Sequence, residues 1–231
     1  MEAKRVTLFA GHYGSGKTNI AINYAEWLRA SGRQVTVADL DIVNPYFRTQ
    51  DSRERLLSQG IGLIVSPFAG SNLDAPAMPA ETYALLSDPA CSAVLDVGGD
   101  ERGALALGRY SRSIREEGDY EMLFVLNTCR PLTRTVEEAL EVMGEIEEAC
   151  SLPFTALVHN SNLGPHTDAE TVLTGAETAR ALSARTGLPI KMHCAGVSIC
   201  RSLEGMDEPV FPLRLQRLYY QLMEGDKPWQ N

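Results

Sequence analysis

The chain has 231 residues, a formal net charge of −9 at pH 7 and an isoelectric point near 5.0. This length suits one α/β domain with a single large sheet, and no linker, repeat or charge block divides the sequence, so we expect one domain over residues 1–231. The acidic balance argues against a protein that binds nucleic acid by neutralising phosphates, because that function needs a basic surface.

Neither export nor membrane insertion is indicated by the sequence. The first residues lead directly into a strand-like run, which leaves no room for a signal peptide, and no apolar run approaches the ~20 residues of a membrane span. The five cysteines contain no C-x-x-C pair, so we expect reduced thiols. We therefore expect a cytoplasmic protein that binds neither membranes nor nucleic acid.

Short apolar runs alternate with segments of helical spacing along the chain. We expect strands at Val6–Ala10, Gln34–Ala38, Gly62–Ser66, Ala93–Val97, Met122–Asn127, Phe154–His159 and Ile190–His193. We expect helices at Asn19–Ala30, Ser52–Ser58, Pro79–Leu86, Leu105–Glu116, Thr133–Cys150, Asp168–Thr186 and Pro212–Met223. This order predicts an α/β fold with a mostly parallel central sheet, helices on both faces and ligands at the carboxyl ends of the strands.

The loop after the first expected strand matches the Walker A pattern G-x-x-x-x-G-K-[ST] without a mismatch. The matching residues and the one that follows them are Gly11, His12, Tyr13, Gly14, Ser15, Gly16, Lys17, Thr18 and Asn19. The glycines let backbone N–H groups point at a β-phosphate, and the following helix adds its positive dipole end. Lys17 is expected to reach the β and γ oxygens and the Thr18 hydroxyl to hold Mg²⁺, which predicts a P-loop NTPase.

Two carboxylates, Asp39 and Asp41, follow the second expected strand. Their i, i+2 spacing points both toward the side on which the P-loop lies, and Pro45 stops the strand. We expect one of them to orient the attacking water or a receiving hydroxyl, and the other to support the Mg²⁺ shell through water. A capped and solvated loop start is the alternative.

Asp96 ends the fourth expected strand and is the candidate Walker B residue, which binds Mg²⁺ through water. The next residue is Val97, which argues against the ATPases whose catalytic glutamate directly follows the Walker B aspartate. Gly98 and Gly99 would allow close approach to a γ-phosphate and a hinge that responds to its loss.

Asn160 follows the sixth expected strand, where its amide could accept from N6 and donate to N7 of adenine. The guanine-specific pattern N-K-x-D would need an acid where Leu163 stands. The sequence therefore favours ATP over GTP, although an amide that only shapes a turn also fits Asn160.

The ordered motifs GHYGSGKT, DLDIVNPYFR, VLDVGGD, FVLNTCRP, LVHNSNLG and AGVSICRSLEGMDEPV resemble the MinD/ParA/CobQ group of SIMIBI P-loop ATPases over nearly the whole chain. Bacterial ATP-binding proteins that share GHYGSGKT and D-[LV]-D-I-V-N-P-Y-F-R look closer still. The resemblance implies ATP, Mg²⁺, slow hydrolysis, nucleotide-dependent dimerisation and a client protein. It also implies roles by position, with Asp41 placing water, Asp96 as an indirect Mg²⁺ ligand, Asn160 at the base, and the loop that begins with Ala195 and Gly196 beside it.

One position departs from that family pattern. Where the family carries a signature lysine that reaches across a dimer to the partner's phosphates, this chain has His12. A histidine carries no dependable positive charge at neutral pH. Whether ATP draws two chains together, or a partner supplies the missing cation in the manner of an arginine finger, is left open by the sequence.

Three function classes fit these motifs, and the sequence favours the first. It is an accessory ATPase that switches a client protein in metallocentre maturation, assembly or positioning. The second is a small-molecule kinase or ATP-dependent synthetase in which Asp41 activates a substrate, with Tyr46, Phe47 and Arg48 available to hold an anion. The third is a binding module with little hydrolysis. The four histidines are scattered without metal-ligand spacing, so we expect no metal site from them.

Overall fold

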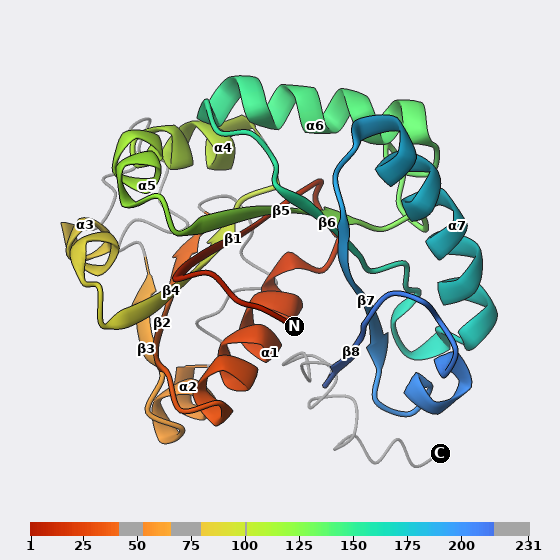
Figure 1. Ribbon diagram of the computed structural model, residues 1–231, viewed down its shortest axis with the longest axis horizontal. Helices are drawn as coiled ribbons and strands as arrows, with labels where there is room; N and C mark the ends of the chain where they lie inside the picture. The colour runs from red at the N-terminus through yellow and green to blue at the C-terminus, as the bar shows by residue number, and fades with distance from the viewer. Residues whose placement is uncertain (42–52, 66–79, 100, 215–231) are drawn as a thin grey trace, which may run out of the picture.

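The strands form one parallel sheet in the computed structural model, which describes residues 1–41, 53–65, 80–99 and 101–214 (Figure 1). They are β1 (Val6–Ala10), β2 (Gln34–Leu40), β3 (Gly62–Val65), β4 (Cys91–Val97), β5 (Tyr120–Leu126), β6 (Ala156–His159), β7 (Ile190–Gly196) and β8 (Val210–Leu213). Their order across the sheet is β3-β2-β4-β1-β5-β6-β7-β8, and each neighbouring pair is parallel. The expected α/β fold is confirmed.

Helices cover both faces of the sheet, as Figure 1 shows. One face packs against α1 (Lys17–Ala30) and α2 (Arg53–Ser58). The other packs against α3 (Ala80–Ser87), α4 (Glu101–Gly108), α5 (Ser111–Glu117), α6 (Val136–Cys150) and α7 (Ala169–Thr186). Strand β1 is buried along its whole length, and its alternate residues divide between the two clusters, with Leu8 on the α6 side and Phe9 on the α1 side.

The position of β1 decides where a ligand can bind. It lies between β4 and β5, with Phe9 in register with Asp96 and Ala10 with Phe124. Strands β2, β3 and β4 lie on one side of β1, and β5 to β8 lie on the other. The direction in which successive strands are added therefore reverses at β1. Parallel sheets bind ligands in the crevice outside such a switch point. The loops that follow β1, β4 and β5 therefore meet there.

Two expected elements are wrong in part. The single helix expected over Leu105–Glu116 is two helices, because the chain turns after Gly108, where a Cβ would lie 3.1 Å from the carbonyl oxygen of Ala149 in α6. The chain also contains β8, which no pattern indicated; Pro212 lies inside it, where we expected a helix to begin. The rest of that expected helix, from residue 215, lies outside the described residues.

Several expected features also fall outside the described ranges: Pro45, Tyr46, Phe47, Arg48, and the ends of three expected elements at Ser52, Ser66 and Pro79. Among the helices that the structure does describe, none has the length and apolar character needed to cross a membrane.

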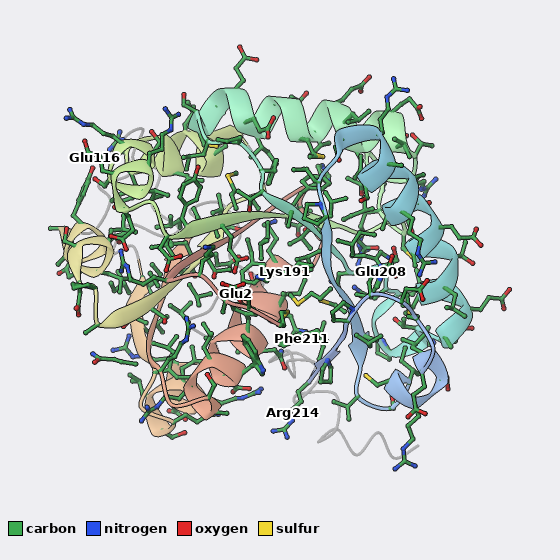
Figure 2. The ribbon with its side chains drawn as sticks, in the orientation of Figure 1. Glu2, Glu116, Lys191, Glu208, Phe211 and Arg214 are labelled. Atoms are coloured by element: carbon green, nitrogen blue, oxygen red, sulfur yellow. The ribbon has the colours of Figure 1, made fainter. Side chains whose placement is uncertain are left out.

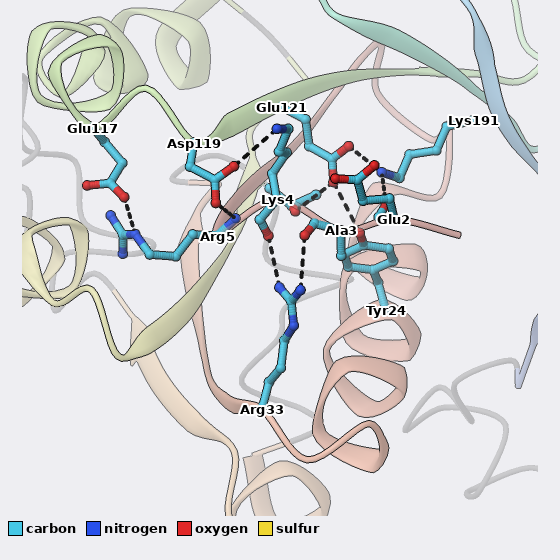
Figure 3. A network of polar contacts seen from close by, with 11 residues as sticks. Glu2, Ala3, Lys4, Arg5, Tyr24, Arg33, Glu117, Asp119, Glu121 and Lys191 are labelled. Carbon is cyan, nitrogen blue, oxygen red and sulfur yellow. Dashed lines mark hydrogen bonds and ion pairs between the residues drawn. The ribbon is translucent and has the colours of Figure 1, made fainter.

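A buried polar network joins four elements at the amino-terminal edge of the sheet (Figure 3). The Glu121 carboxylate accepts hydrogen bonds from the hydroxyls of Thr7 (3.0 Å) and Tyr24 (3.1 Å), and it pairs with the Lys191 ammonium. Burial raises the pKa of Tyr24, and the charge of Glu121 raises it further. This network closes the edge opposite to the P-loop and ties β1, β5 and β7 to helix α1.

We expect the substitution Glu121→Ala to lower the free energy of unfolding by about 3–5 kcal/mol, because it leaves the Lys191 ammonium without its counter-charge and two buried hydroxyls without their acceptor. Glu116→Ala is the matched control. Glu116 points away from the body of the protein (Figure 2), and its i, i+4 pair with Arg112 is exposed. Urea unfolding should show a large fall in midpoint for the first variant only. Equal midpoints for the two variants would contradict this account of the network.

Candidate nucleotide-binding site

The Walker A residues form a turn that only glycine can complete. Gly16 caps the start of α1 with a φ of 94°, in the left-handed region. There is also no room for a side chain at Gly16, because a Cβ there would lie 2.3 Å from Nδ2 of Asn160. The Ser15 N–H donates to the His12 carbonyl at 3.2 Å and closes the turn. The loop therefore has the tight form that brings backbone N–H groups close to an anion.

Lys17 begins α1 with a nearly buried side chain, 5% exposed, and its ammonium donates to the His12 carbonyl at 3.2 Å. Gly99, two residues beyond β4, passes directly over this group. A Cβ on Gly99 would lie 2.7 Å from the Lys17 Nζ and 2.6 Å from the backbone nitrogen of Tyr13. The loop after β4 is thus in contact with the P-loop at the place expected for the terminal phosphate.

Two carboxylates lie side by side on adjacent strands below the P-loop. Asp39 of β2 is in register with Asp96 of β4, and the two are 3% and 1% exposed. Burial raises the pKa of Asp96 well above its usual range, and the charge of Asp39 adds to the effect. The nearby Thr18 hydroxyl and Lys17 ammonium lower the pKa of Asp96 and so partly offset this rise. The Thr18 hydroxyl is close to the carboxylate but does not form a hydrogen bond with it.

Asp41 lies at the rim of the same site. Its backbone N–H donates to Oδ1 of Asp39 at 3.0 Å, and a Cβ on Gly98 would lie 3.4 Å from Oδ1 of Asp41. Asp39 is therefore the buried member of the pair, and Asp41 is the half-buried one that faces the loop after β4. The structure brings together the three acids that the sequence singled out, beside Lys17 and Thr18.

Asn160 holds the P-loop from the β6 side. Its side chain is 2% exposed, and its Nδ2 donates to the Ser15 carbonyl at 2.7 Å. Its backbone carbonyl accepts from the Asn162 amide at 2.9 Å. The sequence interpretation considered a contact with the base or a turn residue, and it missed this tie to the P-loop. Ala195 and Gly196 end β7, which is the neighbour of β6 in the sheet, so the loop after β7 starts beside the loop that carries Asn160.

Arg130 is a second contact that sequence reasoning missed. It follows β5, and its Nε donates to the Gly14 carbonyl at 3.1 Å while the side chain stays exposed. The signal in the sequence was an arginine in a loop after a strand. Only the sheet order, which places β5 next to β1, gives that arginine its position beside the phosphate loop.

A buried pair of histidines supports β6 and β7 just before these loops. The Nδ1 atoms of His159 and His193 are 2.9 Å apart, so the expectation of scattered histidines is wrong for these two. Burial lowers the pKa of His159 to about 3, and His193 lowers it further. The Nε2 of His193 lies 3.2 Å from the carboxylate of Glu208, which also accepts two hydrogen bonds from Arg180. The histidines are thus part of the packing between two strands. Among the described residues, no group of three His, Cys, Asp or Glu could by itself hold a metal ion.

Solved structures with a similar fold include the cell division protein FtsY of Thermotoga maritima, at 20% identity and a TM-score of 0.57. They also include FtsY of Elizabethkingia anophelis in complex with GDP (17%, 0.53) and the signal recognition particle 54 kDa protein of Aeropyrum pernix K1 in complex with GDP (19%, 0.55). The matches cover 84%, 85% and 83% of this chain. No family model and no curated protein matches the chain.

The chain spans 63% and 58% of the length of the two FtsY chains and 41% of the 54 kDa protein. At these identities the likeness concerns the fold. The shared fold is the α/β arrangement described above, a parallel central sheet with helices on both faces.

We expect Gly99→Ala to weaken nucleotide binding by about tenfold or more, because the added methyl would displace the Tyr13 backbone or the Lys17 ammonium. Gly144→Ala is the control, since a Cβ there meets nothing within 4 Å. Alanine in this helical position should preserve binding and raise stability slightly. Titration with a fluorescent nucleotide measures both variants. Wild-type affinity in the Gly99 variant would show that the loop after β4 does not approach the phosphates.

Proposed function

We propose that this protein is an ATP-dependent switch of the MinD/ParA/CobQ type, which binds ATP with Mg²⁺, hydrolyses it slowly and controls a client protein. The observation that carries the proposal is the contact of Gly99 with Lys17 and Tyr13. A loop that touches both the phosphate lysine and a P-loop N–H would move when a γ-phosphate arrives or leaves. A switch requires such a loop, whereas a passive binding module does not need one.

The residues present suit Mg²⁺ bound together with nucleotide. Neither oxygen of the Asp96 carboxylate has a hydrogen-bond partner among the described residues, although the side chain is buried. An acid in that setting needs a cation or a bound water to balance it. Thr18 would be the direct ligand, and Asp96 and Asp41 would act through water. When bound, the ion would neutralise charge on the phosphate oxygens during their transfer.

Asp41 is the residue to which we assign the attacking water. It is half-buried, at the mouth of the site, and its carboxylate faces Gly98. Asp39 positions it by accepting from its backbone N–H. The same geometry would serve a kinase, in which a substrate hydroxyl replaces the water, so the experiment below distinguishes the two reactions.

The proposed preference for ATP rests on the loop after β6. In the segment 160–168 the one acid is Asp168, and its carboxylate is already used as the N-cap of α7, where it accepts from the Thr171 N–H at 2.8 Å and the Thr171 hydroxyl at 2.6 Å. Leu163, at the place of the acid that would bind guanine, is 51% exposed. This segment thus has no acid at the position from which the guanine-specific pattern would bind N1–H and N2–H, and its one acid is engaged through Oδ1 at the start of α7.

The location and assembly of the protein are part of the same proposal. The cysteines of the described part are all free thiols, which suits the reducing and ATP-rich cytoplasm. We propose a nucleotide-dependent homodimer only where a client supplies a cation, because the His12 side chain bonds to its neighbouring Tyr13 carbonyl at 3.0 Å. We propose no role in binding nucleic acid or membranes.

We expect Lys17→Ala to weaken ATP binding by well over tenfold, since a charged hydrogen bond to phosphate contributes about 1.5–3 kcal/mol.

The Asp41→Asn variant should still bind ATP with Mg²⁺ but lose most hydrolysis, because the amide keeps the shape of the side chain and loses its charge. Lys4→Ala and Asp207→Asn change the same residue types at exposed positions and serve as controls. Calorimetry and phosphate release give the two readouts. Fast transfer to a metabolite in a substrate screen would replace the switch by a kinase.

In a direct competition titration, ATP should displace a labelled nucleotide at a concentration at least several-fold lower than GTP, because Leu163 stands where the guanine-specific pattern places an acid. CTP provides the baseline for binding through the phosphates alone. A clear preference for GTP would reject the ATP assignment and leave the P-loop assignment intact.

A further inference from the structure

A groove lies beside the P-loop, outside the proposed phosphate site. Its volume is about 490 Å³, and it lies between helices α4 and α6. Its inner end is formed by His12 and Gly99, and its apolar floor includes Val142 and Ile146 of α6. The groove thus begins at the residues that contact Lys17 and extends outward between two helices.

The outer rim of the groove combines an apolar wall with acids. Leu105 of α4 lines it and is 52% exposed, so an apolar side chain faces solvent at the rim. Across from it, Glu145 and Glu148 of α6 line the same groove. A molecule that fills the groove would meet an apolar surface on one side and carboxylates on the other.

The two glutamates belong to a longer stripe, which we define as Glu137, Glu141, Glu145 and Glu148. Their spacing of i, i+4, i+8 and i+11 places all four on one face of α6, over about 17 Å. All four side chains are exposed, and none has an ion pair with a described residue. Helix α6 contains no lysine or arginine.

By contrast, the other two glutamates of α6 have structural roles. Glu138 completes the capping box with Thr135, and Glu147 accepts from the Phe154 N–H at 2.7 Å. The stripe is therefore the part of the acidic helix that the fold does not use. Four like charges on one exposed face repel each other, so this face is stabilised when cations approach it.

We propose that this groove binds a basic amphipathic helix of the client protein, with an apolar side chain seated between Leu105 and Val142 and with lysines or arginines along the stripe. Charge complementarity selects this occupant. A second copy using the same face would set the stripe against itself, and anionic lipid or nucleic acid would be repelled by it.

The position of the groove also suggests how nucleotide would control the client. His12 and Gly99 form its inner end, the His12 carbonyl accepts from Lys17, and Gly99 lies against the same ammonium. A triphosphate that attracts Lys17 would change both contacts and hence the inner end of the groove. This last step rests on the proposed ATP switch, whereas binding of the basic helix to the groove does not.

The probe for the test is a labelled, alanine-rich helical peptide of about 16 residues, with leucines on one face and lysines at i, i+4 spacing. Fluorescence anisotropy should show that Glu145→Lys with Glu148→Lys weakens its binding by about tenfold, and that Leu105→Ser weakens it roughly threefold. The control is Glu170→Lys with Glu177→Lys on α7, which makes the same change in net charge at exposed positions and should have less than a roughly twofold effect. A peptide with glutamates in place of lysines should not bind.

Equal losses in the α6 and α7 variants would overturn the proposal, since the attraction would then be general. Unchanged binding in the α6 variant would overturn it as well. Each variant is also titrated with ATP alone, which should bind as in wild type because none of these side chains belongs to the phosphate site. Affinity for the peptide should differ at least roughly threefold between ADP and a non-hydrolysable ATP analogue. Equal affinities would reject control by nucleotide, while failure of ATP binding in wild type would reject the switch and leave the groove result standing.

Discussion

The buried pair of carboxylates, Asp39 and Asp96, is the constraint on which the site depends. Two like charges on adjacent strands, both nearly inaccessible to water, cannot ionise together without positive charge nearby. Lys17 supplies one such charge, and its side chain is almost buried beside them. The rest of the site follows from this need, because a protein that buries two acids under an anion-binding loop must bring cations to the same place.

The frame around that pair is held from three sides. Asn160 binds the Ser15 carbonyl from the β6 side, Arg130 binds the Gly14 carbonyl from the β5 side, and Gly99 closes over the loop from the β4 side. Two of these contacts are hydrogen bonds to backbone carbonyls, and they orient the loop without using its N–H groups. The Ser15 N–H closes the turn on the His12 carbonyl, so the loop is shaped before a ligand arrives.

The buried polar network at Glu121 and the histidine pair at His159 have a different purpose. The Glu121 carboxylate pairs with Lys191 of β7 and accepts from the Tyr24 hydroxyl (Figure 3). The Nδ1 atoms of His159 and His193 bond to each other between β6 and β7, so these buried atoms have partners. They keep the strand ends in register, so that loops far apart in sequence converge at one edge of the sheet. The acidic stripe on α6 belongs to neither group. It concentrates negative charge on one face of one helix, within a chain whose net charge is already −9.

The sequence by itself determined the fold class and the phosphate loop. The Walker A pattern identified Gly16, Lys17 and Thr18 because a loop that binds phosphate through its backbone needs those residue types in that order, whatever surrounds it. The alternation of apolar runs predicted a parallel sheet for a similarly local reason, since burial on both faces shows in each strand separately. Asp39, Asp41 and Asp96 were recognised because each follows or ends a strand.

Only the tertiary structure decided which residues meet. The register that sets Asp39 beside Asp96, the tie from Asn160 to Ser15 and the hydrogen bond from Arg130 all join residues more than 50 positions apart. Such contacts depend on the order of strands across the sheet, and that order leaves no periodic trace in the chain. The strand β8 escaped prediction for a related reason: it is short, contains Pro212, and is stabilised by pairing with β7 more than by its own pattern.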